Sequence, residues 1–441
     1  MQYLESVRSL QDDPQALEQL YRTASQRGEV GAFQAAIEQM WQSAPESPLL
    51  AAWHYRLQLD TPEVHDVPAH WKAAVPLSVV TGLLFWGLSD VNHLMVADYM
   101  PYLVLVWAPL AAVLALVFLA WMGKEKPLLR LGVLGGVLLV VSAYVVWAAP
   151  TLLGGLHSLD LEHYLTLAVP HLPLLAWGAL GVLVLGLGSA VEERFAFLIK
   201  SVEVVITAGL FLIAGVTFAA ITVGLFSALG VEISEVMMRL MVAGGFGLLP
   251  ILALATVYDP ARSPLEQDFS QGLSRFVHTL MRLMLVPTLV VLAIYIVFIP
   301  LNFMEPFQNR DVLLVYNIML FAVMGLLLGA LPVRAGEVSV RVRLWLRRAL
   351  IGVVVMALLV SVYAMAAIVY RTVTMGGITI NRMTVIGWNG INITLLGVML
   401  YRQAGRGDSA WVDEVQRVFA LGTNAYLLWT LFLILGVPLL F

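Results

Sequence analysis

The chain contains no cysteine, which excludes disulfides, thiolate metal sites and cysteine nucleophiles and leaves the redox compartment undetermined. Charged residues are also scarce, at 12% of the chain, whereas ordinary soluble domains hold about 25%. The formal net charge of −4 is small and does not indicate a nucleic-acid partner. No motif indicates a cofactor, a metal site or a catalytic residue. Apolar residues make up 60% of the chain, more than a soluble protein could bury, so lipid is the expected solvent.

Residues 1–66 are the polar part of the chain, and they predict a soluble helical segment. Apolar residues recur there at helical spacing, with breaks at glycines and prolines. The order of helix, turn, helix and proline resembles a single tetratricopeptide-like unit, which cannot bury its own apolar face. Two interpretations remain open: a cap packed on the membrane domain, or a docking site for a protein partner. The polar, acidic start shows no signal peptide.

Residues 67–441 predict an all-α transmembrane domain. Each apolar segment approaches the roughly 20 residues that a helix needs to cross a bilayer. Eleven segments are expected, near residues 72–89, 102–122, 128–149, 171–190, 199–229, 235–258, 277–299, 312–333, 346–370, 384–401 and 417–439.

The basic residues of the chain predict its orientation. Alternate loops, together with residues 1–72, hold 21 of the 25 lysines and arginines, and the loops between them hold only four. Basic loops stay in the cytoplasm during insertion. The expected protein is therefore a multi-pass membrane protein, with a cytoplasmic N-terminus and an external C-terminus.

Two cytoplasmic segments predict surface structure. Residues 263–276 begin with Ser-Pro-Leu-Glu, a strong helix start, and continue with apolar residues on one face, which favours an amphipathic helix on the membrane surface. The second segment holds a basic run with a tryptophan inside it. It is expected to bind anionic head groups of the inner leaflet through Arg341, Arg343, Arg347 and Arg348.

Polar residues inside the spans are few. Glu203 and Arg282 lie about one turn inside the cytoplasmic ends and are expected to extend toward water. Glu235 and Arg239 have the spacing of an ion pair on one helix. Small residues four apart predict close helix contacts. These pairs are Gly132 and Gly136, Gly215 and Ala219, and Ala243 and Gly247.

The outer loop 150–171 offers side chains suited to binding protons or metals. His157, Asp160 and His163 form a candidate polar patch, with Glu162 and His171 nearby, but their spacing does not match a zinc helix. A second outer loop, 89–100, carries further acids and a histidine that would join the patch if the two loops met.

The most unusual outer stretch runs from Tyr363 to Arg382. It retains Arg371 and Arg382 on the side where basic residues are rare, and a Gly-Gly pair between them permits a sharp turn. The two arginines either pair with outer carboxylates such as Glu235, Glu305 or Asp311, or bind an anionic ligand or head group. The candidate site consists of Arg371, Gly377, Thr379, Asn381 and Arg382.

The same stretch carries a family resemblance. A tyrosine-rich span ending in arginine, then Gly-x-Thr-x-x-Arg, then an apolar span, resembles the bacterial membrane family called domain of unknown function 4153. The matching positions are Tyr370, Arg371, Gly377, Thr379 and Arg382. Ile378 replaces the usual leucine, and the resemblance covers roughly residues 260–402. It implies a bacterial inner-membrane protein and no particular chemistry.

Three functions agree with these features. The favoured one is a non-enzymatic membrane protein that binds lipid or a protein partner, alone or as a subunit of a larger assembly. A transporter or channel for a small or lipidic solute would use the interior asparagines, such as Asn389 and Asn392. An enzyme acting on lipid-linked substrates would need convergent acids or histidines, and only the His157–His163 loop offers them.

Overall fold

A computed structural model describes residues 3–26, 30–60, 70–124, 126–153, 158–269, 272–333, 339–374, 376–404 and 411–440. The chain divides into an N-terminal unit, Met1–Pro68, and a membrane unit, Ala69–Phe441. This division agrees with the domain boundary expected near residue 66.

The N-terminal unit consists of four helices: α1 (Leu4–Ser9), α2 (Pro14–Gln26), α3 (Val30–Ser43) and α4 (Pro48–Asp60). Asp13 begins α2 by accepting the backbone N–H groups of Gln15 and Ala16, and proline occupies the first position of both α2 and α4. The helices bury a core of their own. It includes Leu17, Phe33, Ile37, Leu50, Trp53 and Leu57.

The expectation that this segment could not bury its apolar face is therefore wrong. A helix-turn-helix pair alone lacks enough partners, but α1 and α4 supply the missing surface. Tyr3 from α1's N-terminal flank and Trp53 from α4 both contact the ring of Phe33 on α3.

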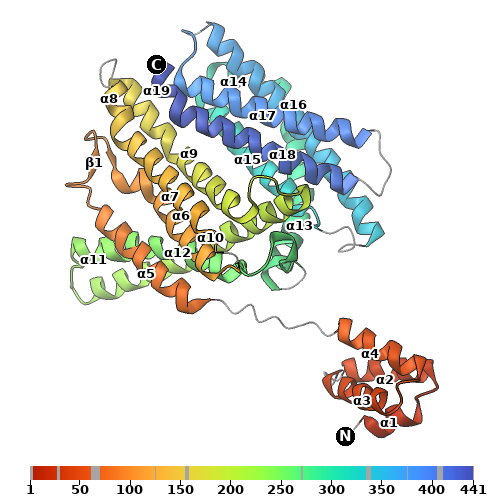
Figure 1. Ribbon diagram of the computed structural model, residues 1–441. Helices are drawn as coiled ribbons and strands as arrows, with labels where there is room; N and C mark the ends of the chain where they lie inside the picture. The colour runs from red at the N-terminus through yellow and green to blue at the C-terminus, as the bar shows by residue number, and fades with distance from the viewer. Residues whose placement is uncertain are drawn as a thin grey trace. The chain divides into compact units, whose positions relative to one another are not determined.

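The membrane unit is a bundle of helices (Figure 1). Within the described residues, eleven helices are long and apolar enough to cross a bilayer, which confirms the all-α architecture and the expected number of spans. The elements are α5 (Trp71–Leu88), α6 (Tyr102–Met122), α7 (Leu128–Ala143), η1 (Tyr144–Ala148), α8 (Ala149–Leu153), α9 (Ser158–Leu185), α10 (Val191–Ala228), α11 (Glu235–Arg239), η2 (Leu240–Gly244), α12 (Gly245–Val257), η3 (Pro264–Glu266), α13 (Gly272–Phe298), η4 (Ile299–Asn302), α14 (Glu305–Gln308), α15 (Arg310–Ala330), α16 (Val340–Thr374), α17 (Ile380–Ala404), α18 (Trp411–Leu431), η6 (Phe432–Gly436) and α19 (Val437–Leu440). The basic end is defined here as the end where α10, α13 and α16 begin and where α9 and α15 finish.

Several spans are longer than expected, among them α9, α10 and α16. α9 starts at Ser158 and holds Pro170 and Pro173 inside the helix, which membrane helices tolerate. α16 includes the basic run in its first turns, so that run is helical and not a loop. α10 has 38 residues and a length of about 57 Å, whereas the hydrocarbon core of a bilayer is about 30 Å thick.

The amphipathic helix expected over residues 263–276 is absent from the described part of that segment. Pro264–Glu266 forms one 3₁₀ turn, and α13 begins only at Gly272. The capping box between Ser263 and Glu266 does form. The turn ends there because Gln267 is buried and bonds back to the backbone of Asp259, which directs the chain away from a helical path.

One short hairpin interrupts the helices. β1 (Met95–Val96) and β2 (Met100–Pro101) pair antiparallel, with Val96 opposite Met100. Ala97 and Asp98 make the turn, and both have positive φ angles, as a tight hairpin connection requires.

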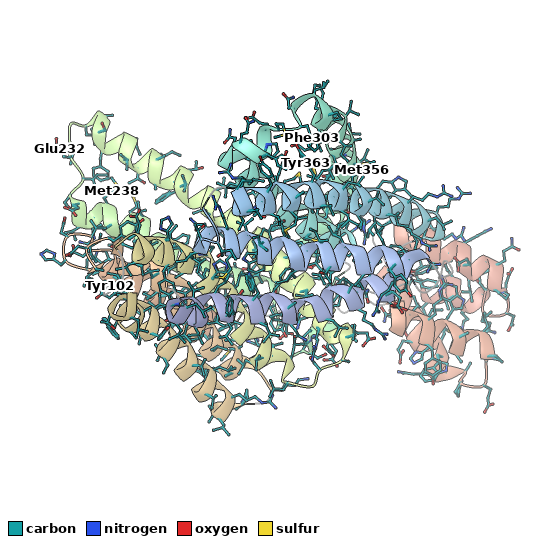
Figure 2. All side chains as sticks on the ribbon, turned by 90° about the horizontal axis from the view of Figure 1, so that it is seen from above. Tyr102, Glu232, Met238, Phe303, Met356 and Tyr363 are labelled. Carbon is teal, nitrogen blue, oxygen red and sulfur yellow. The ribbon has the colours of Figure 1, made fainter. Side chains whose placement is uncertain are left out.

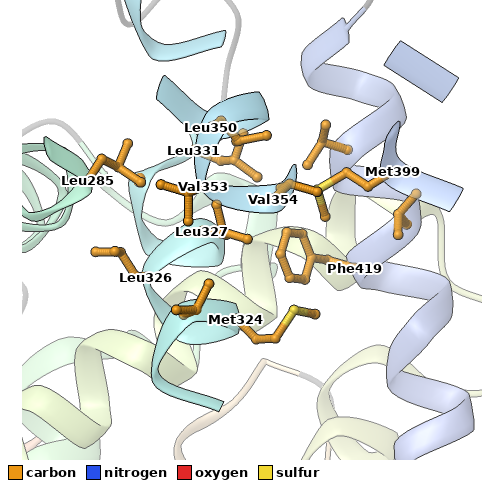
Figure 3. Packing of buried hydrophobic residues seen from close by; sticks show 14 of the residues in the cluster. Leu285, Met324, Leu326, Leu327, Leu331, Leu350, Val353, Val354, Met399 and Phe419 are labelled. Atoms are coloured by element: carbon orange, nitrogen blue, oxygen red, sulfur yellow. The ribbon is translucent and has the colours of Figure 1, made fainter. Parts of the chain in front are cut away.

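The largest apolar core joins α13, α15, α16, α17, α18 and the start of α10 (Figure 3). Leu327 of α15 and Leu350, Val353 and Val354 of α16 are fully buried in it. Three further cores lie in the membrane unit. One joins α5, α6, α7, α9 and α12, one joins α6, α7, α8 and α9 with η6 and α19, and one joins α14, α15 and α16.

The helices α5 and α12 cross with their backbones in contact. A Cβ atom on Gly247 would lie 2.8 Å from the Cα atom of Gly82, so the two backbones touch. The close contact expected at Gly247 is therefore confirmed. The contacts expected at Gly132, Gly136 and Gly215 are wrong, because a Cβ at these positions would meet nothing within 4 Å.

The second half of α10 and the following α11 form an arm with little packing. Most side chains from 209 to 240 are exposed, including Ile213, Phe218 and Leu225. Glu232 and Met238 of this arm lie at the periphery of the membrane unit (Figure 2). Because these side chains are apolar, the arm faces lipid.

Candidate functional site

The predicted outer arginine site lies at the turn between α16 and α17. Gly376 and Gly377 both have positive φ angles, as expected of a sharp glycine turn. Thr379 caps α17 by accepting the backbone N–H of Arg382. The Arg382 side chain donates to the Gly377 carbonyl oxygen at 2.7 Å, so it closes the turn on itself.

Arg371 lies half-buried on the last turns of α16. Its Nη1 atom is buried and has no hydrogen-bond acceptor among the described residues. The expected carboxylate partners are engaged elsewhere: Glu235 accepts from Asn92, and Glu305 accepts from Asn309. The Asp311 side chain lies outside the described residues. For Arg371, the binding of an anionic ligand therefore stays a prediction. Asn381 lies half-exposed beside the same turn.

Replacing Gly377 by alanine should destabilise this turn by about 1 kcal/mol, because an L side chain rarely adopts its φ of +85°. Limited proteolysis of the purified protein at this turn measures the effect. Alanine at Gly390 is the control, since a Cβ there would meet nothing within 4 Å. Equal cleavage of both variants would contradict the structural role of the turn.

The outer polar patch is placed only in part. His157 lies outside the described residues, as does the side chain of Asp160, and His163 lies half-buried near the start of α9. The two outer loops do meet, because Tyr99 donates to Glu162 at 3.0 Å. His171 does not belong to the patch. Its side chain is buried between α9 and α17, where Trp388 of α17 donates to its Nε2 atom.

The ion pair expected between Glu235 and Arg239 is replaced by a connection between helices. Arg239 pairs with Asp90 at 3.3 Å and donates to Ser89 and the Trp86 carbonyl, which ties α11 to the end of α5. Partial burial raises the pKa of Asp90, but hydrogen bonds from His93 and the Asn92 backbone, together with the Arg239 charge, hold that pKa below its ordinary value.

The basic run lies on the first turns of α16. Arg341 and Arg348 are exposed on one helix face together with Trp345, whereas Arg347 turns inward and donates to the Gln403 carbonyl. Arginine beside tryptophan on one exposed face suits the head-group region of a bilayer. Arg343 is half-buried beside this face.

A groove of about 130 Å³ opens near the basic end, where α9, α10 and α18 meet. Its walls are mostly apolar, with Trp177 and Phe197 stacked at 5.7 Å between ring centroids. Gly178 and Gly181 of α9 bring the helices together, because a Cβ on either glycine would press on a neighbouring side chain. The lining residues are Trp177, Gly178, Gly181, Val182, Leu185, Gly186, Leu187, Ser189, Arg194, Phe197, Leu198, Ala420, Thr423, Asn424 and Leu427.

The mouth of this groove is cationic. Arg194 uses its Nε atom to bond Ser189, and no carboxylate of the described residues pairs with it. Arg130 lies close by, with its Nη1 atom 3.5 Å from where a Cβ on Gly186 would stand. An apolar groove with two guanidinium groups at its mouth can hold an anionic amphiphile. Sequence reasoning missed it, because the α18 residues that complete the groove lie far along the chain from those of α9 and α10.

A buried charged cluster lies on α10, in the same stretch that forms one wall of the groove. Lys200 donates to Glu203 at 2.8 Å, to the Asp268 carbonyl at 2.6 Å and to Ser274 at 3.0 Å. Glu203 also accepts from Ser274 at 2.7 Å and is only 1% exposed. The expectation that Glu203 extends to water is therefore wrong, because its partners come to it from inside the bundle.

The cluster lacks the chemistry of a serine–lysine catalytic pair. Such a pair needs a neutral lysine to take the hydroxyl proton. Here the Lys200 amino group lies within hydrogen-bonding distance of three acceptors, which are Glu203, the Asp268 carbonyl and Ser274. Ser274 is also directed at the carboxylate and not at a cavity.

The same cluster is joined to the end of α15. The last carbonyl groups of a helix have no partners within it. His278 Nδ1 lies 2.9 Å from the Gly329 oxygen, and Arg282 Nε donates to the Ala330 oxygen at 3.0 Å. His278 and Arg282 are one turn apart on α13, so this helix caps α15. Arg282 is therefore engaged inside the protein.

The interior asparagines are paired or packed. Asn392 accepts from the Tyr426 hydroxyl, and both Asn389 and Asn392 are 1% exposed. Neither lines the groove described above or the shallow pocket formed by Gly387, Gly390, Ile391, Thr394, Leu395 and Ala425. Comparisons with protein-family models, curated proteins and solved structures find no match to this chain.

Proposed function

We propose that this polytopic protein binds an anionic membrane lipid in the groove between α9, α10 and α18. The single observation that carries this proposal is the pairing of an apolar wall, formed by Trp177, Phe197 and Leu427, with Arg194 at the mouth. A lipid offers the matching chemistry, an acyl chain attached to a phosphate. The role is binding, without catalysis.

The charge distribution supports the setting. With the basic end in the cytoplasm, as the positive-inside tendency favours, Arg194 and Arg130 lie at the depth of the inner-leaflet phosphates of a bacterial inner membrane. Arg341, Trp345 and Arg348 would lie in the same layer and add a second contact with head groups. The packed surroundings of Asn389 and Asn392 favour binding over transport through the bundle centre.

Replacing Arg194 by alanine should weaken retention of an anionic phospholipid about fivefold, since one basic residue near the head groups contributes about 1 kcal/mol. Native mass spectrometry of the detergent-purified protein, supplied with phosphatidylglycerol, measures the bound fraction. The matched control is Lys126→Ala, which removes one basic residue at the same end without touching the groove.

A second variant tests the apolar wall. Asn424→Trp places a large ring at the exposed side of the groove and should reduce binding of both anionic and neutral phospholipids. If Arg194→Ala and Lys126→Ala lost equal amounts of lipid, the arginine would act only as surface charge, and the proposal would be wrong.

A further inference from the structure

The two oxygen atoms of Glu203 are in different situations. Oε2 accepts hydrogen bonds from Lys200 and Ser274. Oε1 is buried and accepts none from the described residues, but it faces His278 Nε2 at 3.9 Å. A buried carboxylate oxygen is costly without a donor, so the side chain that faces it matters.

The tautomer of His278 follows from its other ring nitrogen. Nδ1 lies 2.9 Å from the Gly329 carbonyl oxygen, which can only accept, so Nδ1 carries a proton. In the neutral ring, Nε2 would then carry a lone pair. That lone pair would face the Oε1 lone pairs of an ionised Glu203. Two acceptors cannot form a hydrogen bond with each other, but one additional proton between them would allow it.

We propose that Glu203 and His278 form a proton-binding site that takes up one proton between Oε1 and Nε2. The proton converts the His278 ring to imidazolium, whose Nε2–H donates to Oε1. One N–H bond forms, and the reverse step releases the proton to water. The site is independent of the lipid groove, which lies against other residues of α10.

The surrounding charges permit this uptake. The charged side chains around the pair are Lys200 on α10, Asp268 in the segment before α13, and Arg282 on α13. Lys200 opposes a second positive charge. The carbonyl end of α15 favours one, because a helix carries about half a negative charge at its C-terminus. His278 meets that end directly through Gly329.

A proton can reach the site from the basic end. Asp268 is exposed, and its carbonyl oxygen accepts a hydrogen bond from Lys200. The cluster is therefore in direct contact with a surface residue at this end. The ring of Phe269 lies against the Lys200 amino group, with Nζ 4.6 Å from the ring centroid.

Nitrogen NMR of the full-length protein, labelled with ¹⁵N-histidine and reconstituted in lipid nanodiscs, tests the proposal. We expect one histidine signal to pass directly from imidazolium to the Nδ1–H tautomer as the pH rises from about 5 to 9, the range in which histidine titrates. Free histidine in water favours the other tautomer, so this signal is distinctive. H278Q identifies it by removing it.

E203Q supplies the second measurement, since glutamine keeps the shape and loses the charge. The pH at which His278 loses its imidazolium proton should fall by at least about one unit, because the facing carboxylate anion is gone. The exposed control His93→Gln should leave the transition unchanged. A histidine that never changes charge, that uses the Nε2–H tautomer, or that titrates identically in E203Q would overturn the proposal. If E203Q did not fold, the wild-type tautomer alone would still decide it.

Discussion

Replacing Lys200 by methionine should lower the free energy of unfolding of the membrane unit by about 3–5 kcal/mol, the range observed when one partner of a buried ion pair is removed. The substitution leaves the Glu203 carboxylate buried at 1% exposure, with Ser274 as its remaining hydrogen-bond donor among the described residues. It also removes the ammonium donor of the Asp268 carbonyl.

Thermal unfolding in detergent, followed by intrinsic fluorescence, measures this loss. Lys72→Met is the matched control, because Lys72 is exposed at the start of α5 and should change stability by less than about 0.5 kcal/mol. The double variant Lys200→Met with Glu203→Leu should recover much of the loss, since an apolar pair can replace a buried ion pair. A single variant as stable as the control would show that the ion pair contributes nothing.

Replacing Gly247 by alanine should destabilise the protein by about 1–3 kcal/mol, which is the usual cost of overpacking. The new Cβ would lie 2.8 Å from the Cα atom of Gly82 and 2.9 Å from the Thr81 oxygen, and neither backbone atom can move without separating α5 from α12.

Gly245→Ala provides an unusually close control. It makes the same chemical change two residues away on the same helix, where a Cβ would meet nothing within 4 Å. Alanine is the better helix former by up to about 1 kcal/mol, so this variant should be neutral or slightly stabilised. Unfolding midpoints of the two variants should therefore move in opposite directions. Equal midpoints would contradict the backbone contact.

The number of spans was predictable because each span must be apolar along its whole length, a signal that does not depend on its neighbours. Boundaries were less predictable. Pro170 and Pro173 remain inside α9, and the arginines of residues 341–348 continue α16 outward, so both helices extend beyond the apolar run.

The groove and the charged cluster were not predictable, since both depend on which helices become neighbours. Glu203 and Lys200 alone resemble surface residues near a helix end. Only the return of Ser274 and His278 along α13 shows that these charges are internal. The helix predicted over residues 263–269 was wrong for a related reason. The capping box does form, but the burial of Gln267 and Phe269 prevails over the local preference for helix.

The length of α10 has a mechanical consequence. This helix is continuous for 38 residues; its first turns carry Arg194, Lys200 and Glu203, and its far half lies unsupported among apolar side chains. A helix longer than the local hydrocarbon thickness tilts as the bilayer thins. A change in bilayer thickness would therefore tilt the exposed far half of α10. Because the helix is continuous, the same tilt would act on its first turns, which contact the groove and the buried charges.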